Sequence, residues 1–320
     1  MRNILEKSDF ATRIEALGRR LKADGYSFCT PTPSTHTRVV GRNRPGADIL
    51  CDVFGWNKAV APSELPERYQ EVLQDRDFFD VEDGYVRARL RYSSLGPLLL
   101  AHSGFPTREA DAVFFGPDTY RFAYAIQAFH DRNPGFSPGS CVDIGAGSGA
   151  GGLFCATLYP RLSEIALLDI NPRALAFAAA NSALNGIPAI PRCSDILSAW
   201  LQPADLIICN PPYLVDPALR AYRHGGGDWG ADLALRALRQ ALNQLSPMGH
   251  LLLYTGSPIV DGQDKFLEAA QPLLEQGTLK YRYEEIDPDV FGEELDNWPY
   301  DQADRIATVM LHVKGSDLRR

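Results

Sequence analysis

The sequence predicts an α/β domain with a mostly parallel sheet, preceded by a smaller N-terminal domain of helices and paired strands. The chain has 320 residues, which is too long for one ordinary domain and typical of two. From Gly139 onward, short apolar segments alternate with stretches of helical periodicity, the pattern of strands covered by helices. We therefore expect a first domain over 1–110, a connector over 111–135 and a second domain over 136–320.

The composition is that of a globular protein, with 45% apolar and 22% charged residues. No apolar run approaches the roughly 18 residues of a membrane span, and the N-terminus lacks a signal-peptide core, so we expect a cytosolic protein without a membrane partner. Six cysteines form no Cys-x-x-Cys pair, and we expect neither disulfides nor a bound metal. Residues 1–110 hold 16 basic and 15 acidic side chains, whereas 111–320 hold 16 and 25, which disfavours a nucleic-acid partner.

Two helices are predicted in the first domain. The first has an apolar stripe at spacings of four, three and four, followed by Gly25 as a stop. This stripe consists of Phe10, Ile14, Leu17 and Leu21. The second is expected over Glu64–Leu73, with Ser63 as its N-cap and Pro66 in its first turn.

A pair of strands follows these helices. The segment Tyr85–Tyr92 alternates apolar and basic residues with period two, and a turn at Ser93–Gly96 leads into a second strand over Pro97–Ser103. Helices followed by a two-stranded wing resemble a winged-helix domain. The alternation puts three arginines on one face, which is either a solvated surface or a docking surface for an acidic partner. They are Arg87, Arg89 and Arg91.

The second domain reads as alternating strands and helices without an internal repeat. The predicted strands are Ser140–Ile144, Ile165–Asp169, Asp205–Cys209, His250–Thr255, Leu279–Glu285 and Ile306–Val313. Helices are predicted from 117 to about 130 and near 150–159, 172–185, 231–245 and 261–275. This order implies a layered α/β arrangement.

The strongest local motif is a strand that runs into a glycine turn over Val142–Gly149. Gly145, Gly147 and Gly149 let a ligand approach the backbone at a helix N-terminus. The next strand ends at Asp169, where a carboxylate can accept both hydroxyls of a ribose. Together these features predict a nucleoside-containing cofactor; a tight turn without a ligand, with Asp169 as a loop carboxylate or helix cap, is the alternative. Neither a serine-hydrolase elbow nor a phosphate-binding P-loop is present.

A second motif, Asn210-Pro-Pro-Tyr213, follows a buried strand. Neither proline can extend the strand or enter a helix directly, so the chain turns rigidly where open α/β sheets bind ligands. The Asn210 side chain and the backbone offer two carbonyls that can hydrogen-bond an amide or aromatic amine and direct its lone pair at an electrophile. Tyr213 adds a face for stacking. We expect Asn210, Pro211, Pro212 and Tyr213 to grip a substrate nitrogen.

With these motifs the sequence resembles a class I S-adenosylmethionine-dependent methyltransferase of the small-domain group. That group includes the release-factor glutamine methyltransferases and the amino-methyltransferases acting on adenine or guanine. The resemblance covers about 113–313, and its motifs are 143–149, Asp169, 194–196, 210–213 and 246–249. It implies a doubly wound, Rossmann-like sheet of seven strands, with S-adenosyl-L-methionine as cofactor and S-adenosyl-L-homocysteine as product.

The same resemblance implies a set of cofactor contacts. These are Asp143, Gly145, Ala146, Gly147, Gly149, Asp169, Ile170, Asp195, Ile196, Asn210 and, from the segment before the core, Phe115 and Thr119. Asp169 is implied to bind the ribose, and Asp195 and Ile196 the adenine. Asp195 as a helix cap and Phe115 as plain core are the simpler interpretations.

The chain also departs from the glutamine enzymes. Their N-terminal domain is all-helical, whereas this one has arginine-rich strands, and their Arg-Pro pair is replaced by Gly116-Pro117. Because the N-terminal domain normally selects the substrate, a release factor is not assumed as the acceptor. The segment Gly225–Gly230, in contrast, resembles the glycine segment that follows the Asn-Pro-Pro-Tyr loop in those enzymes.

One further segment, 284–304, holds nine acidic and no basic side chains between the last two predicted strands. Phe291, Trp298 and Tyr300 are interleaved with the acids. A solvated loop and an acidic rim that selects a cationic substrate both remain open, and either would repel phosphates.

We therefore predict an N-methyltransferase that acts on an amide or amine nitrogen of a protein, a peptide or a small molecule. One alternative is methyl transfer to adenine or guanine in RNA or DNA, for which the arginine face would have to supply a basic channel. Another alkyl transfer from the same cofactor and a non-catalytic cofactor-binding module are further alternatives. The intact Asn-Pro-Pro-Tyr motif argues against the last of these.

Overall fold

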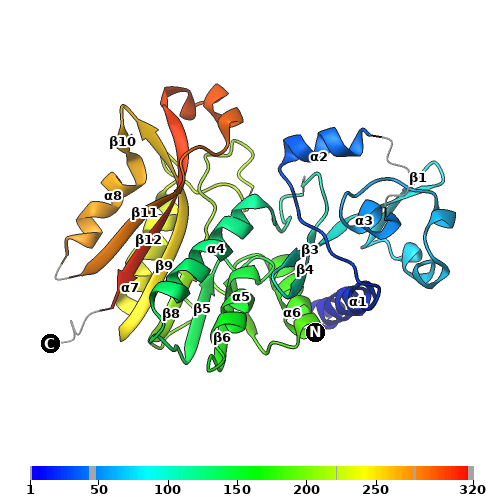
Figure 1. Cartoon of the computed structure of the whole chain (residues 1–320), viewed down its shortest axis with the longest axis horizontal. Coiled ribbons are helices and arrows are strands. Elements are labelled where there is room, and N and C mark those ends of the chain that lie inside the picture. Colours follow the sequence, from blue (N-terminus) through cyan, green and yellow to red (C-terminus); the bar gives the residue numbers. More distant parts are fainter. Residues whose placement is uncertain (1, 43–47, 108, 221, 277–278, 316–320) are drawn as a thin grey trace.

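A computed structural model shows an N-terminal part of helices and hairpins beside a large twisted sheet (Figure 1). The structure describes residues 2–42, 48–107, 109–220, 222–276 and 279–315, with side chains from residue 9 onward. Within these ranges no helix is long and apolar enough to cross a membrane.

Eight strands form the large sheet. They are β5 (Ser140–Ile144), β6 (Glu164–Asp169), β7 (Ile190–Cys193), β8 (Ala204–Cys209), β9 (Leu245–Val260), β10 (Gln263–Asp264), β11 (Lys280–Asp287) and β12 (Arg305–Lys314). Seven follow the order β11-β12-β9-β8-β5-β6-β7, and β10 pairs with β9. Neighbours from β9 to β7 are parallel, whereas β12 is antiparallel to β9 and β11. The expected seven-stranded, mostly parallel sheet is confirmed; β7 was not predicted, and β9 is longer than predicted.

Helices cover both faces of this sheet. They are α4 (Pro117–Arg132), α5 (Ala150–Leu158), α6 (Pro172–Asn185), α7 (Asp232–Gln244) and α8 (Lys265–Leu274). Apolar residues of α4 and α5 share one core cluster with one face of the strands, and those of α7 and α8 share another with the opposite face. The predicted helices are confirmed, and the sheet is doubly wound.

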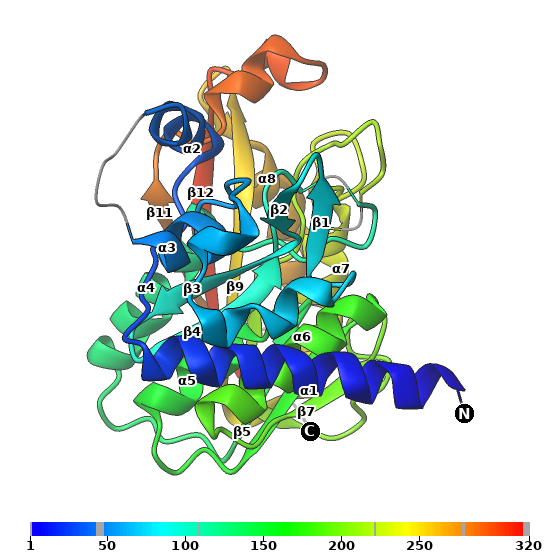
Figure 2. The ribbon, with the colours of Figure 1, turned by 90° about the vertical axis from the view of Figure 1, so that its right-hand side faces the viewer.

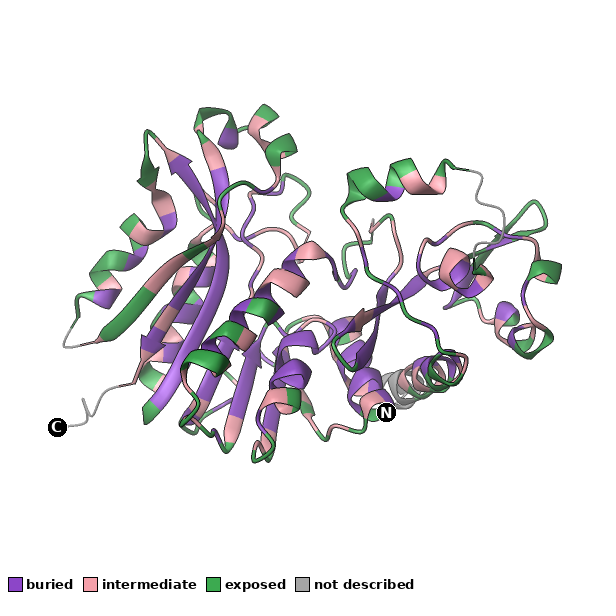
Figure 3. Ribbon diagram, in the orientation of Figure 1, coloured by how far each residue is buried: buried purple, intermediate pink, exposed green. Residues whose placement is uncertain are grey.

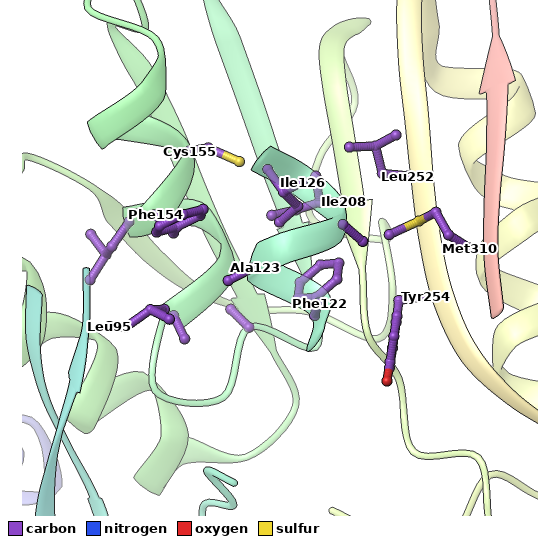
Figure 4. Close-up of a cluster of buried hydrophobic side chains, with 14 of the residues drawn as sticks. Leu95, Phe122, Ala123, Ile126, Phe154, Cys155, Ile208, Leu252, Tyr254 and Met310 are labelled. Atoms are coloured by element: carbon purple, nitrogen blue, oxygen red, sulfur yellow. The ribbon is translucent and has the colours of Figure 1, made fainter. Parts of the chain in front are cut away.

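The core between α4 and the sheet is built from aliphatic and aromatic side chains. Phe122 and Ile126 of α4 point toward Ile208 of β8 and Tyr254 of β9, with Met310 of β12 beyond them (Figure 4). The central strands are buried along most of their length, as Figure 3 shows. Because this core is rigid, the strand ends that carry functional side chains are held in fixed positions.

The described residues of the N-terminal part form three helices, three single turns of 3₁₀-helix and two hairpins. Its elements are α1 (Arg2–Ala23), α2 (Pro33–Val40), α3 (Ile49–Phe54), the turns Pro62–Glu64, Glu67–Tyr69 and Glu71–Gln74, β1 (Phe79–Glu82), β2 (Tyr85–Ala88), β3 (Leu90–Leu95) and β4 (Leu98–Ser103). The predicted first helix is confirmed, and the order of helices followed by paired strands is as expected.

The second predicted helix, Glu64–Leu73, is wrong. The chain forms three short 3₁₀ turns instead, and Leu65 between the first two is extended, at φ −79° and ψ 143°. Pro66 explains the break, because a proline disfavours helical angles at the residue before it.

The continuous strand with three arginines on an open face is also wrong. The strand is interrupted at Arg89, and the Arg91 side chain is only 3% exposed. The Arg91 guanidinium lies over the rings of Phe28 and Phe105, and its Nε donates to Asn57 Oδ1 at 3.0 Å. Burial lowers the pKa of Arg91 to about 10. A period-two pattern cannot reveal that aromatic side chains from distant segments cover one face.

The N-terminal part packs on α6. Helix α1 runs lengthwise beside α6, and the β3–β4 hairpin lies next to both (Figure 2). Phe177 and Leu184 of α6 belong to the same apolar cluster as the N-terminal residues. The domain boundaries near 110 and 136 stay a prediction, since α6 belongs by packing to both parts.

Truncation of Phe177 tests this packing. The ring is fully buried and meets Phe10 edge-on at 5.8 Å, so Phe177→Ala leaves a cavity at the contact between the two parts. We expect the free energy of unfolding to fall by about 3–5 kcal/mol in urea titrations. Phe114→Ala, at a ring that is 41% exposed, is the matched control and should cost about 1 kcal/mol or less. Equal losses would contradict the packing described here.

Candidate active site

A cavity of about 230 Å³ lies at the carboxyl ends of β5, β6 and β8. These strands are neighbours in the order β8-β5-β6. From β5 the chain continues to β6 on one side and returns to β8 on the other, so the cavity lies at the point where the strand order reverses. Ligands of open α/β sheets bind at this kind of position.

The floor of the cavity is a glycine turn between β5 and α5. Gly145 and Gly147 have φ values of 66° and 55°, which side chains rarely adopt. A β-carbon on Gly145 would meet no atom within 4 Å, so the backbone there faces open space. The Gly147 N–H donates to Asp169 Oδ2 at 2.8 Å, and the Ala146 N–H donates to the Leu168 carbonyl. Strand β6 therefore fixes the shape of the turn.

Two buried carboxyl groups lie beside this turn. Asp143 is fully buried and accepts a hydrogen bond from the Gly152 N–H at 2.8 Å. Loss of hydration, reinforced by the nearby Asp169, raises the pKa of Asp143 to about 7. Burial also raises the pKa of Asp169, although backbone N–H groups of Asn171 and Gly147 partly oppose the effect. Both side chains line the cavity.

The Asn210–Tyr213 loop forms another part of the cavity wall. The Asn210 side chain makes no hydrogen bond to any residue that the structure describes, and it lines the cavity. The loop is clamped by the glycine segment: the Leu214 carbonyl accepts from the Gly225 N–H at 2.8 Å. A β-carbon on Gly225 would lie 2.7 Å from the Pro212 carbonyl oxygen, and one on Gly230 would lie 2.2 Å from that of Tyr213. The glycines thus permit close backbone packing beneath the loop.

Tyr213 differs from the expectation that it presents a free stacking face. Its ring is only 7% exposed and packs against Gly256, where a β-carbon would lie 2.4 Å from the ring. Its buried hydroxyl has no hydrogen bond of normal geometry, and burial together with the neighbouring Asp118 carboxylate raises its pKa. Tyr213 therefore forms part of the cavity wall and offers little ring surface for stacking against a substrate.

Most of the residues predicted for the site meet around this cavity. They are Asp143, Gly145, Ala146, Gly147, Asp169, Ile170, Asp195, Ile196, Thr119, Asn210, Pro211, Pro212 and Tyr213. Their assignment to cofactor or substrate stays a prediction.

Gly149 and Phe115 do not line the cavity, and their contact with the cofactor stays a prediction. Gly149 is the N-cap of α5, and a β-carbon there would lie 3.1 Å from the Leu167 side chain in the core. Phe115 is buried and stacks on His102 at 4.9 Å. Its neighbour Phe114 lines the cavity instead, because successive side chains of an extended segment point to opposite sides.

Sequence reasoning missed many of the lining residues, and the aromatic and charged ones among them are Phe114, Asp118, Phe122, Tyr222, Arg223 and Phe291. Asp118 and Phe291 lie in segments that the sequence singled out for other reasons. Nothing in the local pattern marked Tyr222 and Arg223, which reach the cavity on the loop after the Asn-Pro-Pro-Tyr motif. The rings of Phe114 and Tyr222 are nearly parallel, at an interplanar angle of 4° and a centroid distance of 6.4 Å.

That loop is held by a buried carboxylate. Asp216 is 2% exposed and accepts from the Arg220 backbone N–H and from two guanidinium nitrogens of Arg220. These bonds lower the pKa of Asp216 to about 2. The Tyr222 hydroxyl donates to the Thr107 carbonyl at 3.1 Å, which ties the loop to the segment before α4.

The acidic segment 284–304 is partly neutralised in the fold, where four of its nine acids pair with arginines. Glu294 pairs with Arg223, Asp287 with Arg121 at 2.9 Å, and Glu284 with Arg132. Phe291, in the same segment, contributes to the cavity wall. The segment is therefore neither a free solvated loop nor a uniform acidic rim.

Comparison with known proteins shows that the chain is similar to methyltransferases. The family model described as "Methyltransferase small domain" matches residues 126–260. A release factor glutamine methyltransferase from Koribacter versatilis is 34% identical over 134 residues, which cover 38% of this chain and 47% of that protein. Human methyltransferase HEMK2 is 30% identical over 148 residues, covering 43% and 68%. The ribosomal RNA small subunit methyltransferase C of Vibrio vulnificus is 34% identical over 119 residues, covering 37% and 32%. The chain thus spans about half the length of the first of these relatives.

The raised pKa of Asp143 predicts a specific pH dependence. Because the folded state holds this proton more tightly than the unfolded chain does, ionisation destabilises the fold as pH rises from about 4 to about 7. Asp143→Asn keeps an acceptor for the Gly152 N–H but cannot ionise. Between pH 5 and pH 8, the unfolding free energy of the wild type should fall by about 2–3 kcal/mol relative to the variant. Parallel stability profiles in urea titrations would show that Asp143 is already ionised in the fold at pH 5.

Proposed function

The chain belongs to the methyltransferase small domain family, and we propose that it transfers a methyl group from S-adenosyl-L-methionine to an amide nitrogen of a protein. The observation that carries this proposal is the Asn210 side chain. Its backbone is followed by two prolines that restrict the loop, the side chain has no hydrogen-bond partner among the described residues, and it lines the same cavity as the glycine turn. A polar side chain held rigid and unpaired at a cavity suits recognition of a ligand amide.

The residues that line the cavity fit the proposed cofactor. The exposed backbone of Gly145 and Gly147 leaves room for close approach of a ligand. Four carboxyl groups line the cavity, those of Asp118, Asp143, Asp169 and Asp195. Arg223 is the one cationic side chain among the described lining residues, and Glu294 pairs with it. An acidic lining suits a cofactor that carries a sulfonium and an ammonium group. When bound, the cofactor supplies an electrophilic methyl group.

The protein's part in the reaction is alignment. The Asn210 side-chain carbonyl accepts one hydrogen of the acceptor amide, and a backbone carbonyl of the proline turn accepts the other. These two bonds turn the nitrogen lone pair toward the cavity. Pro211 and Pro212 keep both acceptors in place, because the loop cannot relax into a strand or a helix. No ionised base is required before transfer, since the proton can leave the acceptor afterwards.

A neutral amide fits the cavity better than a phosphate-bearing substrate. Arg223 is engaged by Glu294 and lies near Asp216, so the described lining residues offer no free cation to meet a phosphate. Of the relatives, one is a release factor glutamine methyltransferase and another is HEMK2. The name of the first supports a glutamine side chain as the acceptor.

Methyl transfer to a nucleobase is the second candidate. The similarity to a ribosomal RNA methyltransferase and the parallel rings of Phe114 and Tyr222 at the cavity favour it. Such rings can stack against a flat base as well as against a planar amide.

Removal of the Asn210 amide tests the proposal. With S-adenosyl-L-methionine labelled in its methyl group and a fractionated cell extract, we expect wild-type protein to label the protein fraction. Asn210→Ala should cut turnover by two or more orders of magnitude and leave cofactor affinity, measured by calorimetry, nearly unchanged.

Asn243→Ala provides the matched control, because this asparagine is exposed on α7. It should label the extract as the wild type does. Label in the RNA fraction alone would support the nucleobase alternative. Equal loss of cofactor binding and turnover in Asn210→Ala would mean that Asn210 has a structural role only.

A further inference from the structure

The β3–β4 hairpin is joined to α6 by two asparagines one helical turn apart. Asn181 Oδ1 accepts from the Ala101 N–H at 2.7 Å, and its Nδ2 donates to the Ala101 carbonyl at 2.9 Å. Asn185 makes the same pair of bonds to Leu99, at 3.2 and 2.9 Å. Four residues of helix rise about 6 Å and two residues of strand about 6.6 Å, so the side-chain amides can pair with the free edge of β4 as a neighbouring strand would.

Asn181 makes one bond that Asn185 does not. Its Nδ2 also donates to the Ser148 carbonyl in the glycine turn, at 2.8 Å. Among the described residues no other hydrogen bond reaches this carbonyl. Strand β6 holds the first half of the turn through Ala146 and Gly147, and the Gly149 N–H donates to the Ala146 carbonyl at 2.7 Å, so Asn181 supplies the bond that fixes the Ser148 peptide between them. The Asn181 side chain is fully buried, which makes an unsatisfied partner costly.

The hairpin reaches the cavity by a second route. Where β4 ends, the Ser103 N–H donates to the Val113 carbonyl at 3.1 Å, and the Val113 N–H donates to Ser103 Oγ at 2.9 Å. Val113 and its neighbours Ala112 and Phe114 line the cavity wall. One strand of the N-terminal part is thus connected through Asn181 to the Ser148 carbonyl of the glycine turn and through Val113 to the cavity wall.

We propose that the β3–β4 hairpin contributes to cofactor binding in the cavity and that Asn181 is the positioning residue that connects the hairpin to the cavity. The inference rests on the proposed function, because it assigns cofactor binding to this cavity. Coupling of this kind is reciprocal: a hairpin that orders the turn is itself stabilised when the cavity is filled. From the sequence we expect the N-terminal part to select the substrate. The stability of its β3–β4 hairpin therefore also depends on whether the cofactor is bound.

The test compares Asn181→Ala with Asn185→Ala in the full chain. Both variants remove a pair of bonds to β4, but only Asn181→Ala frees the Ser148 carbonyl. In calorimetric titrations with S-adenosyl-L-homocysteine we expect Asn181→Ala to weaken binding about tenfold or more, and Asn185→Ala to weaken it less than twofold. Thermal denaturation should show both variants to be destabilised, so that stability alone does not explain the difference. Equal affinities in the two variants would overturn the proposal.

Hydrogen exchange on the wild type covers the case in which Asn181→Ala does not fold. Saturation with S-adenosyl-L-homocysteine should slow exchange of the β4 amides of Leu99 and Ala101 several-fold. Exchange in the β1–β2 hairpin, which has no bond to the cavity in the described residues, should stay unchanged. If the ligand binds and the β4 amides do not respond, the hairpin is not coupled to the cavity. If the wild type does not bind the ligand at all, the proposed function fails, and this inference fails with it.

Discussion

The hydrogen bond from the Gly147 N–H to the Asp169 carboxylate holds together the part of the fold on which the site depends. It fixes a turn with left-handed backbone angles, and only that shape leaves the Gly145 and Gly147 backbone open to a ligand. The carboxylate is available because β6 lies directly beside β5 and ends at the same edge. Parallel pairing therefore brings the cofactor motif and its acid together without any contact that is close in sequence.

The same edge explains why the remaining parts of the site converge. Strand β8, on the other side of β5, delivers Asn210, and the glycine segment Gly225–Gly230 packs beneath the loop that follows. These glycines serve the backbone of the loop and not a ligand, since none of them lines the cavity. The hydrogen bonds between the buried Asp216 and Arg220 then hold the loop that carries Tyr222 and Arg223 at the cavity wall. The site is a set of loops, each stiffened by its own buried polar contact.

The sequence predicts the second domain well because its central strands are buried and glycine, proline or asparagine residues mark many of its turns. Strand β5 and helix α6 match their predicted bounds, with glycine or asparagine at the ends. The first domain is harder to predict. Pro66 breaks a helix whose apolar spacing is otherwise regular, and Arg91 is buried by aromatic residues from distant segments. Local pattern does not contain the information that decides those two cases.

For the site, the motif residues could be predicted and most of the wall could not. Thirteen predicted positions line the cavity. Most belong to motifs that directly follow a strand, and the carboxyl ends of parallel strands meet at one edge of the sheet. Phe115 was expected and Phe114 is found, since the sequence does not tell which of two adjacent side chains points inward. Tyr222 and Phe291 arrive through tertiary packing, and Asn181 carries no signal apart from its place on a helix.

A crystal structure of the full chain with S-adenosyl-L-homocysteine is the most direct test of this account. We expect the ligand to occupy the space between the Gly145–Gly147 backbone and Asn210, with Asp169 bonded to its ribose and the Asn210 side chain still unpaired within the protein. Density for the ligand at another place on the chain, or an Asn210 amide turned away from the bound molecule, would contradict the assignment of this cavity to methyl transfer.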